Sequence, residues 1–98
     1  MSVQREVHVE ATPEEVWEAI ATEEGRERWL EEPEREIEVE IHDPPNRLVW
    51  RWQDDEQGPT TVEFRVVAAP AGTRVIVTET EPALPLQMLA SSFALVAA

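Results

Sequence analysis

Aromatic and apolar side chains, rather than catalytic ones, are the residues of this sequence best suited to a chemical role. Trp50 and Trp52 lie two positions apart, so on a β-strand both rings point to the same side of the sheet. Aromatic rings bury about 150–250 Å² each and stack on flat apolar molecules. In so small a domain the rings can instead fill the core, which we favour for Trp17 and Phe64, whereas both interpretations stay open for the pair on the strand. If the fold leaves a pocket, we expect its lining to be Trp29, Ile37, Val39, Ile41, Trp50, Trp52, Phe64, Leu89 and Phe93.

The side chains needed for acid–base, nucleophilic or metal chemistry are few and scattered. The sequence contains no Cys, no Tyr and no Lys, which excludes thiol nucleophiles, Schiff-base lysines and tyrosine general acids. Its only histidines, His8 and His42, have no carboxylate spacing around them that fixes a metal triad, and the acidic run at 54–56 lacks the ligand order of a calcium loop. We therefore assign no catalytic residue, no metal and no cofactor.

The size and charge of the chain narrow the classes of protein to which it can belong. Its 98 residues, 42% hydrophobic and 30% charged, are typical of a single soluble globular domain that spans residues 1–98. The net charge of −13 repels nucleic acid and anionic membrane surfaces, so we expect neither as a partner. The start of the chain lacks the basic flank and apolar run of a signal peptide, which predicts a cytoplasmic location.

Three helices are expected to position the aromatic residues. Thr12-Pro13-Glu14-Glu15 has the cap, the first-turn proline and the reciprocal glutamate of a helix start. Apolar residues then recur at helical spacing as far as Ile20, which predicts a face turned toward the core. A second short helix is expected from about residue 22 to residue 30, and the uncharged tail from 86 to about 97 predicts a closing helix that lies across the sheet.

Alternation of apolar and polar residues predicts five strands. The first precedes the helices, and the other four follow one another as an antiparallel meander. In the second strand, Ile37, Val39 and Ile41 are expected on one face and the acidic residues between them on the other. By the same alternation Arg51 faces away from the tryptophans, so we expect it to pair with that acidic row rather than with a ligand carboxylate. The predicted strands cover residues 3–10, 36–41, 48–53, 62–66 and 73–80.

Four segments of the sequence resemble a known family. They are Val9–Ile20 with its Pro-Glu-x-Val-Trp motif, Trp29, the Pro-Pro-x-x-Leu-Val-x-x-Trp segment at 44–52, and Gly72–Val75. In this order, over about residues 3–80, they resemble bacterial relatives of the C-terminal domain of the activator of heat shock protein 90 ATPase, within the START-like (SRPBCC), birch-pollen-allergen-like superfamily. Only a short stretch separates Trp29 from Ile37, where such proteins usually place a Gly-rich strand and hairpin, so we expect a shortened version.

The resemblance implies both a fold and a function. The implied fold is α+β helix-grip: a curved antiparallel sheet with two short helices after the first strand and a C-terminal helix packed across the sheet. The implied function is binding of a small hydrophobic or amphipathic molecule in the groove between the sheet and that helix. The alternatives are a protein-partner or homodimer module of the activator type and an enzyme resembling polyketide cyclases, with His42 or a buried carboxylate as its acid or base. A shortened sheet and an uncharged helix leave apolar surface exposed, so we expect a homodimer through the C-terminal helix or a sheet edge.

Overall fold

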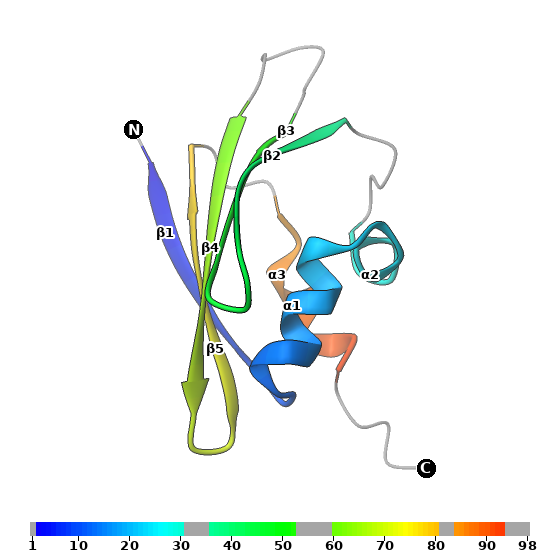
Figure 1. The fold of residues 1–98 in the computed structure, drawn as a ribbon. Coiled ribbons are helices and arrows are strands. Elements are labelled where there is room, and N and C mark those ends of the chain that lie inside the picture. Colours follow the sequence, from blue (N-terminus) through cyan, green and yellow to red (C-terminus); the bar gives the residue numbers. More distant parts are fainter. Residues whose placement is uncertain (1, 31–35, 53–59, 81–83, 94–98) are drawn as a thin grey trace.

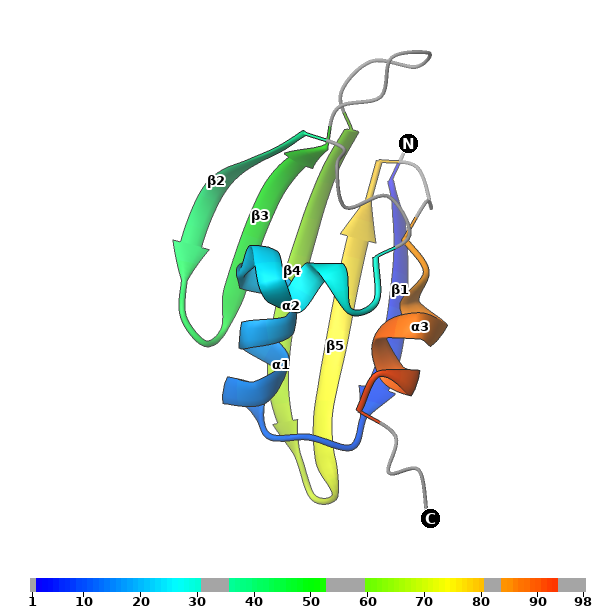
Figure 2. The ribbon, with the colours of Figure 1, turned by 90° about the vertical axis from the view of Figure 1, so that its right-hand side faces the viewer.

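The structure, a computed structural model, describes residues 2–30, 36–52, 60–80 and 84–93. The elements are β1 (Val3–Val9), α1 (Pro13–Ala21), α2 (Glu23–Glu27), β2 (Ile37–Asp43), β3 (Arg47–Trp52), β4 (Thr60–Ala69), β5 (Gly72–Glu79) and α3 (Leu86–Ser91). Within these residues, the five strands form one antiparallel sheet in the order β1-β5-β4-β3-β2, and the three helices lie on one of its faces (Figures 1 and 2). The predicted meander and the predicted fold class are confirmed.

The first two helices begin where the sequence predicts, because their N-terminal caps are complete, although α2 ends at Glu27 rather than near residue 30. Thr12 Oγ1 accepts a hydrogen bond from the Glu15 N–H at 3.2 Å, and the Glu15 carboxylate accepts one from the Thr12 N–H at 3.1 Å. Thr22 caps α2 in a similar way, by accepting from the Gly25 N–H at 2.9 Å. Gly25 lets α2 approach α1 closely, since a Cβ at this position would lie 2.2 Å from the Glu18 carbonyl oxygen. This close packing fixes the direction in which the residues of α2 point.

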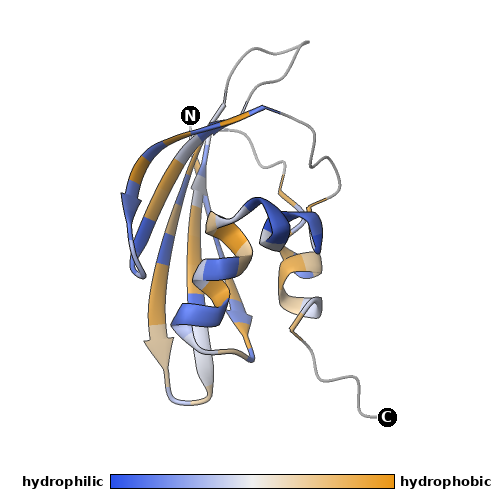
Figure 3. Ribbon diagram, turned by 45° about the vertical axis from the view of Figure 1, so that its right-hand side comes forward, coloured by the Kyte–Doolittle hydropathy of each residue, from blue (hydrophilic) through white to orange (hydrophobic). Residues whose placement is uncertain are grey.

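The hydrophobic core lies between the helices and the inner face of the sheet, which we define as the face that the helices cover. Hydrophobic and hydrophilic residues alternate along the strands, as the banding in Figure 3 shows, so every second side chain points inward. α1 buries Val16, Ala19 and Ile20 and packs on β4 and β5. The indole N–H of Trp29 donates to the Ala19 carbonyl at 2.8 Å, which ties the segment after α2 to α1. These contacts confirm the predicted core face of the first helix.

The alternation predicted for β2 is wrong after Val39. Val39 pairs with Trp50 but Ile41 pairs with Val49, so Glu40 is an extra residue in β2, as in a β-bulge. Because an extra residue reverses the alternation, Ile41 lies on the outer face of the sheet beside Val49, and His42 turns to the inner face. Ile41 therefore does not share a face with Ile37 and Val39, and it cannot line a pocket on the helix side.

The C-terminal helix α3 lies on the inner face, on the β1 side of the sheet (Figure 2). It ends at Ser91, earlier than the predicted end near residue 97, and residues 94–98 lie outside the described part of the chain. Pro85 precedes it without a side-chain cap, and neither end carries a complementary charge, so little holds a longer helix together. None of the helices in the described ranges is long and apolar enough to span a membrane.

A buried ion pair joins the segment that leads into α3 to the sheet. Arg5 of β1 donates from Nε to the Glu79 carboxylate of β5 at 2.9 Å, and from its Nη2 to both that carboxylate and the Leu84 carbonyl. The second carboxylate oxygen of Glu79 accepts from the Leu84 N–H at 3.1 Å. Arg5, which is distant in sequence, therefore shares one polar cluster with Glu79 and the nearby Leu84, and the Glu79 side chain is fully buried within it.

Candidate functional site

Three aromatic rings from β3 and β4 contact one another on the inner face. Trp50 pairs across the sheet with Val62 and Leu48 with Phe64, so Phe64 is the diagonal neighbour of Trp50. The ring centroids of Trp50 and Phe64 lie 4.7 Å apart, and those of Trp50 and Trp52 lie 6.4 Å apart in an edge arrangement. All three side chains are buried. The rings are part of the core, and they can serve as a binding surface only where open space adjoins them.

The other residues predicted to line a pocket fall into two groups. Leu89 and Phe93 lie on or just after α3, on the β1 side of the sheet, whereas β3 and its tryptophans lie on the opposite side of α1 (Figure 2). The structure therefore does not bring all the predicted residues around one space. Trp29, Trp50, Trp52, Phe64 and Leu89 are buried, Ile37 and Phe93 are half-buried, and Val39 is exposed.

The apolar inner face extends onto β2, where the described helices cover it least. Val39 is the direct cross-strand neighbour of Trp50, yet it is 42% exposed, and Ile37, opposite Trp52, is half-buried. α1 instead packs on β4 and β5. One ring contact reaches β2 from α1: Trp17 meets His42 edge-on, with centroids 5.2 Å apart. The bulge that turns His42 inward makes this contact possible.

Arg26 of α2 lies directly over the Trp50 ring. Its guanidinium carbon is 5.7 Å from the ring centroid, and its Nη1 donates to the Ile20 carbonyl at 3.2 Å. Burial lowers the pKa of this guanidinium, and the nearby Glu23 carboxylate offsets part of that effect. The indole Nε1 of Trp50 is buried and has no hydrogen-bond partner among the described residues. This part of the inner face thus combines apolar surface with donors.

Sequence analysis missed Arg26, although the pattern contains a signal for it. Arg26 precedes Trp29 by three positions and Leu30 by four, and residues at these spacings share one face of a helix. Both apolar residues are buried, so the residue one turn before them must also face inward.

The groups considered for acid–base or metal chemistry do not come together. His8 pairs with Arg74 on the outer face, whereas His42 contacts Trp17 on the inner face. Glu79 is the one buried carboxylate of the described residues, and its oxygens accept bonds from Arg5 and Leu84. No cluster of three or more metal-ligating side chains occurs in the described part of the chain. We build no reaction on these residues.

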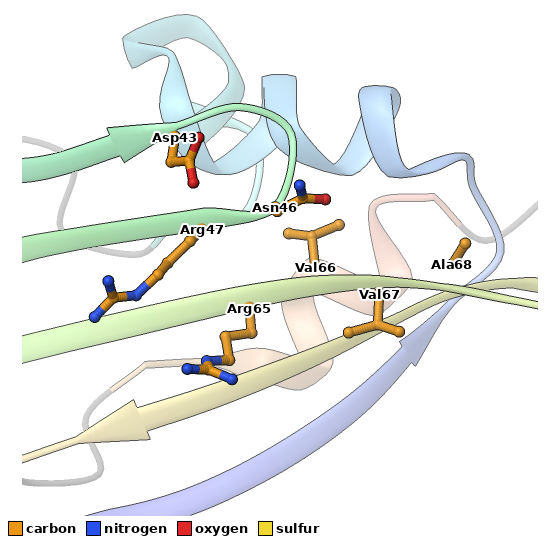
Figure 4. Close-up of a pocket in the computed structure, with 7 residues that line it drawn as sticks. All are labelled: Asp43, Asn46, Arg47, Arg65, Val66, Val67 and Ala68. Carbon is orange, nitrogen blue, oxygen red and sulfur yellow. The ribbon is translucent and has the colours of Figure 1, made fainter.

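Two pockets open away from the helices. One, of about 440 Å³, lies where β4 extends beyond the β2–β3 turn, and Figure 4 shows the Arg47 and Arg65 side chains extending in the same direction away from Asp43. Both guanidiniums reach Glu63, at 2.8 Å and 3.5 Å. The other, of about 300 Å³, lies on the outer face beside Ile41 and Val49. Neither adjoins the aromatic rings, and the arginines of the first are already paired.

Arg51 keeps to the predicted alternation. It lies on the outer face opposite Glu38 of β2, on the other side of the strand from Trp50 and Trp52. It therefore does not reach the inner face, and its ion pair with the acidic row stays a prediction.

The curved antiparallel sheet with helices on its inner face places this protein in the START-like, helix-grip class. The model of the family described as "Activator of Hsp90 ATPase homolog 1-like protein" matches residues 31–92. The chain belongs to this family, which confirms the resemblance found in the sequence. A comparison with curated protein sequences gives no significant match.

Solved structures share the fold over most or all of the chain. Protein MLL2253 from Mesorhizobium loti matches with a TM-score of 0.76 and 17% identity, covering 94% of this chain and 96% of that one. The Aha1 dimer from Colwellia psychrerythraea matches with a TM-score of 0.77 and 13% identity, covering 100% and 99%. CalU16 from Micromonospora echinospora matches with a TM-score of 0.66 and 21% identity, covering 90% of this chain and 64% of that one. At these identities the likeness shows the fold alone.

Proposed function

We propose that this domain binds a small hydrophobic or amphipathic molecule on the inner face of the sheet, between α1–α2 and strands β2–β3. The observation that carries the proposal is the exposure of Val39 directly beside the buried ring of Trp50. An apolar surface that continues from the core to solvent favours an apolar ligand, because covering it removes more area from water. In this proposal Ile37 and Val39 contact the ligand, and Trp50 and Trp52 form the wall behind it.

The remaining predicted residues have supporting roles in this proposal. Trp29 and Phe64 are buried and hold the aromatic wall in place. Leu89 and Phe93 belong to the α3 side, where they pack against the core rather than near β2. The proposed site therefore lies under α1 and α2 instead of under the C-terminal helix.

Titration of tryptophan fluorescence tests the proposal with flat aromatic and fatty-acyl compounds. The chain has four Trp and no Tyr, so the signal reports on the inner face and its surroundings. Val39→Glu places a charge in the ligand's path on an already exposed position, and we expect it to weaken binding at least tenfold. Val67→Glu is the matched control, because Val67 is 41% exposed but lies on the outer face of β4. Equal binding by the two variants, or no saturable response in the folded wild type, would contradict the proposal.

A second candidate function is self-association through α3. The relative from Colwellia psychrerythraea is described as a dimer. In this chain α3 is uncharged and exposes 47% of Met88, whereas the β2 edge carries several acidic side chains that would repel a second copy. We expect Met88→Glu to shift the molecular mass measured by light scattering from dimer to monomer. A wild type that is monomeric at micromolar concentration excludes this candidate. Stimulation of an Hsp90 ATPase, the activity in the family's name, directly tests the partner-binding alternative.

A further inference from the structure

Arg26 brings more hydrogen-bond donors to the inner face than the described residues accept. A guanidinium carries five N–H donors. Among the described residues, the Arg26 side chain donates to one acceptor, the backbone carbonyl of Ile20, and no carboxylate forms an ion pair with Arg26. Its position over the Trp50 ring stabilises the charge but uses none of the remaining donors. In a chain with 21 acidic residues, a half-buried arginine that forms no ion pair with any described carboxylate, including the nearby Glu23, needs an explanation.

The indole of Trp50, over whose ring Arg26 lies, adds an unsatisfied donor. Its Nε1 is buried, and no described residue accepts a hydrogen bond from it. The indole of Trp29, which is equally buried, donates to the Ala19 carbonyl at 2.8 Å. Native proteins rarely leave a buried donor without an acceptor. The donors of Arg26 and Trp50 together therefore point to an acceptor that is not part of the described chain.

We propose that the molecule bound at this face carries a carboxylate, which accepts hydrogen bonds from Arg26 and the Trp50 indole while its apolar part lies against Val39 and Ile37. This inference rests on the binding function proposed above and adds the chemistry of the ligand's polar end. A carboxylate offers about four acceptor sites on two oxygens, and it matches the fork of a guanidinium. Both proposed partners of the carboxylate are thus donors: Arg26 keeps N–H groups beyond its bond to the Ile20 carbonyl, and the Trp50 indole has no acceptor among the described residues.

The charge of the protein favours a carboxylate over a phosphate. The chain carries a net charge of −13, which opposes every incoming anion. A phosphate monoester carries about 1.5 to 2 negative charges near neutral pH, and at this site it would meet a single guanidinium. A monoanion attached to an apolar group is repelled less strongly, and its apolar group also contacts β2. The proposed ligand class is therefore an apolar or aromatic carboxylic acid.

Matched probes separate the carboxylate from the apolar contact. Pyrenebutyrate and pyrenebutanol have the same ring system and chain length, and they differ in an anionic or a neutral end. Binding of each is measured by the anisotropy of pyrene fluorescence, which does not depend on the tryptophans. We expect the wild type to bind the acid at least tenfold more tightly than the alcohol.

Two variants of Arg26 then test whether this residue causes the preference for the acid over the alcohol. Arg26→Gln removes the charge and most donors. We expect it to weaken binding of pyrenebutyrate at least tenfold and to leave binding of pyrenebutanol unchanged. Arg26→Lys keeps the charge and should retain part of the preference. Arg28→Gln is the control, since Arg28 is exposed and lies 3.8 Å from Glu18. Circular dichroism of each variant shows that α2 and the sheet stay folded.

A spectroscopic measurement tests the Trp50 contact without a change in the backbone. In ¹⁵N–¹H spectra, the acid should shift the indole resonance of Trp50 more strongly than the alcohol does. Trp50→Phe assigns that resonance by its disappearance and keeps an aromatic ring in the core.

The outcomes separate the two proposals. Equal binding of acid and alcohol, unchanged in Arg26→Gln, overturns the carboxylate site and leaves the apolar site standing. An acid preference lost in Arg28→Gln but kept in Arg26→Gln also overturns it. Failure of the folded wild type to bind either probe overturns both proposals.

Discussion

The two edges of the sheet differ in how fully helices and buried side chains cover them. On the β1 side, α3 covers the strand, and Arg5, Glu79 and Leu84 share a polar cluster whose carboxylate is fully buried. On the β2 side, the inner face ends in the exposed Val39, and a ring contact between Trp17 and His42 links this strand to α1. The β1 side is therefore closed, and we call the β2 side the open side.

The comparison shows where stability and binding are located in so small a domain. A buried ion pair costs desolvation, but it fixes one arrangement of the segments that make it. The open side has fewer buried contacts, so its local opening costs less free energy than global unfolding. Ligand-binding surfaces are drawn from such regions, which is why the proposed site lies there. The predictions below test whether the closed side carries the stability and the open side the binding.

The largest loss of stability is expected on the closed side from Arg5→Met. This change leaves the buried Glu79 carboxylate without its guanidinium, and breaking a buried pair from one side costs about 3–5 kcal/mol. Glu79→Gln should cost less, since the Arg5 side chain is 34% exposed and can be rehydrated. The free energy of unfolding in urea measures both.

A double variant sharpens this prediction. Arg5→Met combined with Glu79→Met removes both charges, so we expect it to be more stable than Arg5→Met alone. If the double variant is instead less stable than Arg5→Met and Glu79→Gln, the cluster stabilises the closed side through packing rather than through its charges.

Gly25→Ala should disturb both stability and the open side. An added Cβ would lie 2.2 Å from the Glu18 carbonyl oxygen and close to the Ala19 Cα, so α2 must move away from α1. Overpacking of this kind costs about 1–3 kcal/mol. Because Arg26 follows directly, we expect the preference for a carboxylate probe to fall together with the melting temperature. A variant that melts earlier but keeps its preference would show that Arg26 does not depend on this packing.

Much of the fold could be predicted because local rules and tertiary packing agree. The capping box at Thr12 and the inward alternation of Trp50 and Trp52 depend only on neighbours in sequence, and both are confirmed. The inward orientation of Glu79 could also be predicted from the sequence, since Glu79 continues the inward row of Val75 and Val77. A charged residue in such a row needs a polar partner, and Arg5, which lies in the inward row of β1, provides one.

The site could be predicted less well, because it depends on features that the sequence pattern does not mark. Glu40 alternates as regularly as its neighbours, and only pairing with β3 shows that it is the extra residue. The bulge removes Ile41 from the inner face and brings His42 to it. The direction of Arg26 follows from the close approach of α2 to α1, which is a tertiary contact. Each of these features arises between elements rather than within one.

His42→Ala should loosen the open side with a small effect on global stability. The edge contact with Trp17 is an aromatic pair, which contributes about 0.5–1.5 kcal/mol, and His42 is exposed enough that the lower end is expected. Amide hydrogen exchange should accelerate in β2 while β1 and β5 stay protected. Equal acceleration in β1 would break the distinction between the two sides.

The smallest effect is expected from an exposed ion pair on the outer face of the closed side. Arg74 donates to both carboxylate oxygens of Glu6, at 2.8 Å and 2.9 Å, and these bonds lower the pKa of Glu6. A carboxyl group with a depressed pKa in the folded state stabilises the fold above its unfolded pKa, and this contribution is lost as the pH falls through the folded-state pKa. Glu6→Gln should therefore lower the melting temperature slightly near neutral pH, and added salt should shrink the difference.

At strongly acidic pH the wild type and Glu6→Gln should melt together. In an Arg74→Gln background the Glu6 change should have no effect at either pH. A pH-independent difference would mean that Glu6 contributes through packing. The exposed pair would then stabilise the fold through side-chain contacts, unlike the cluster of Arg5 and Glu79, for which a charge effect is expected.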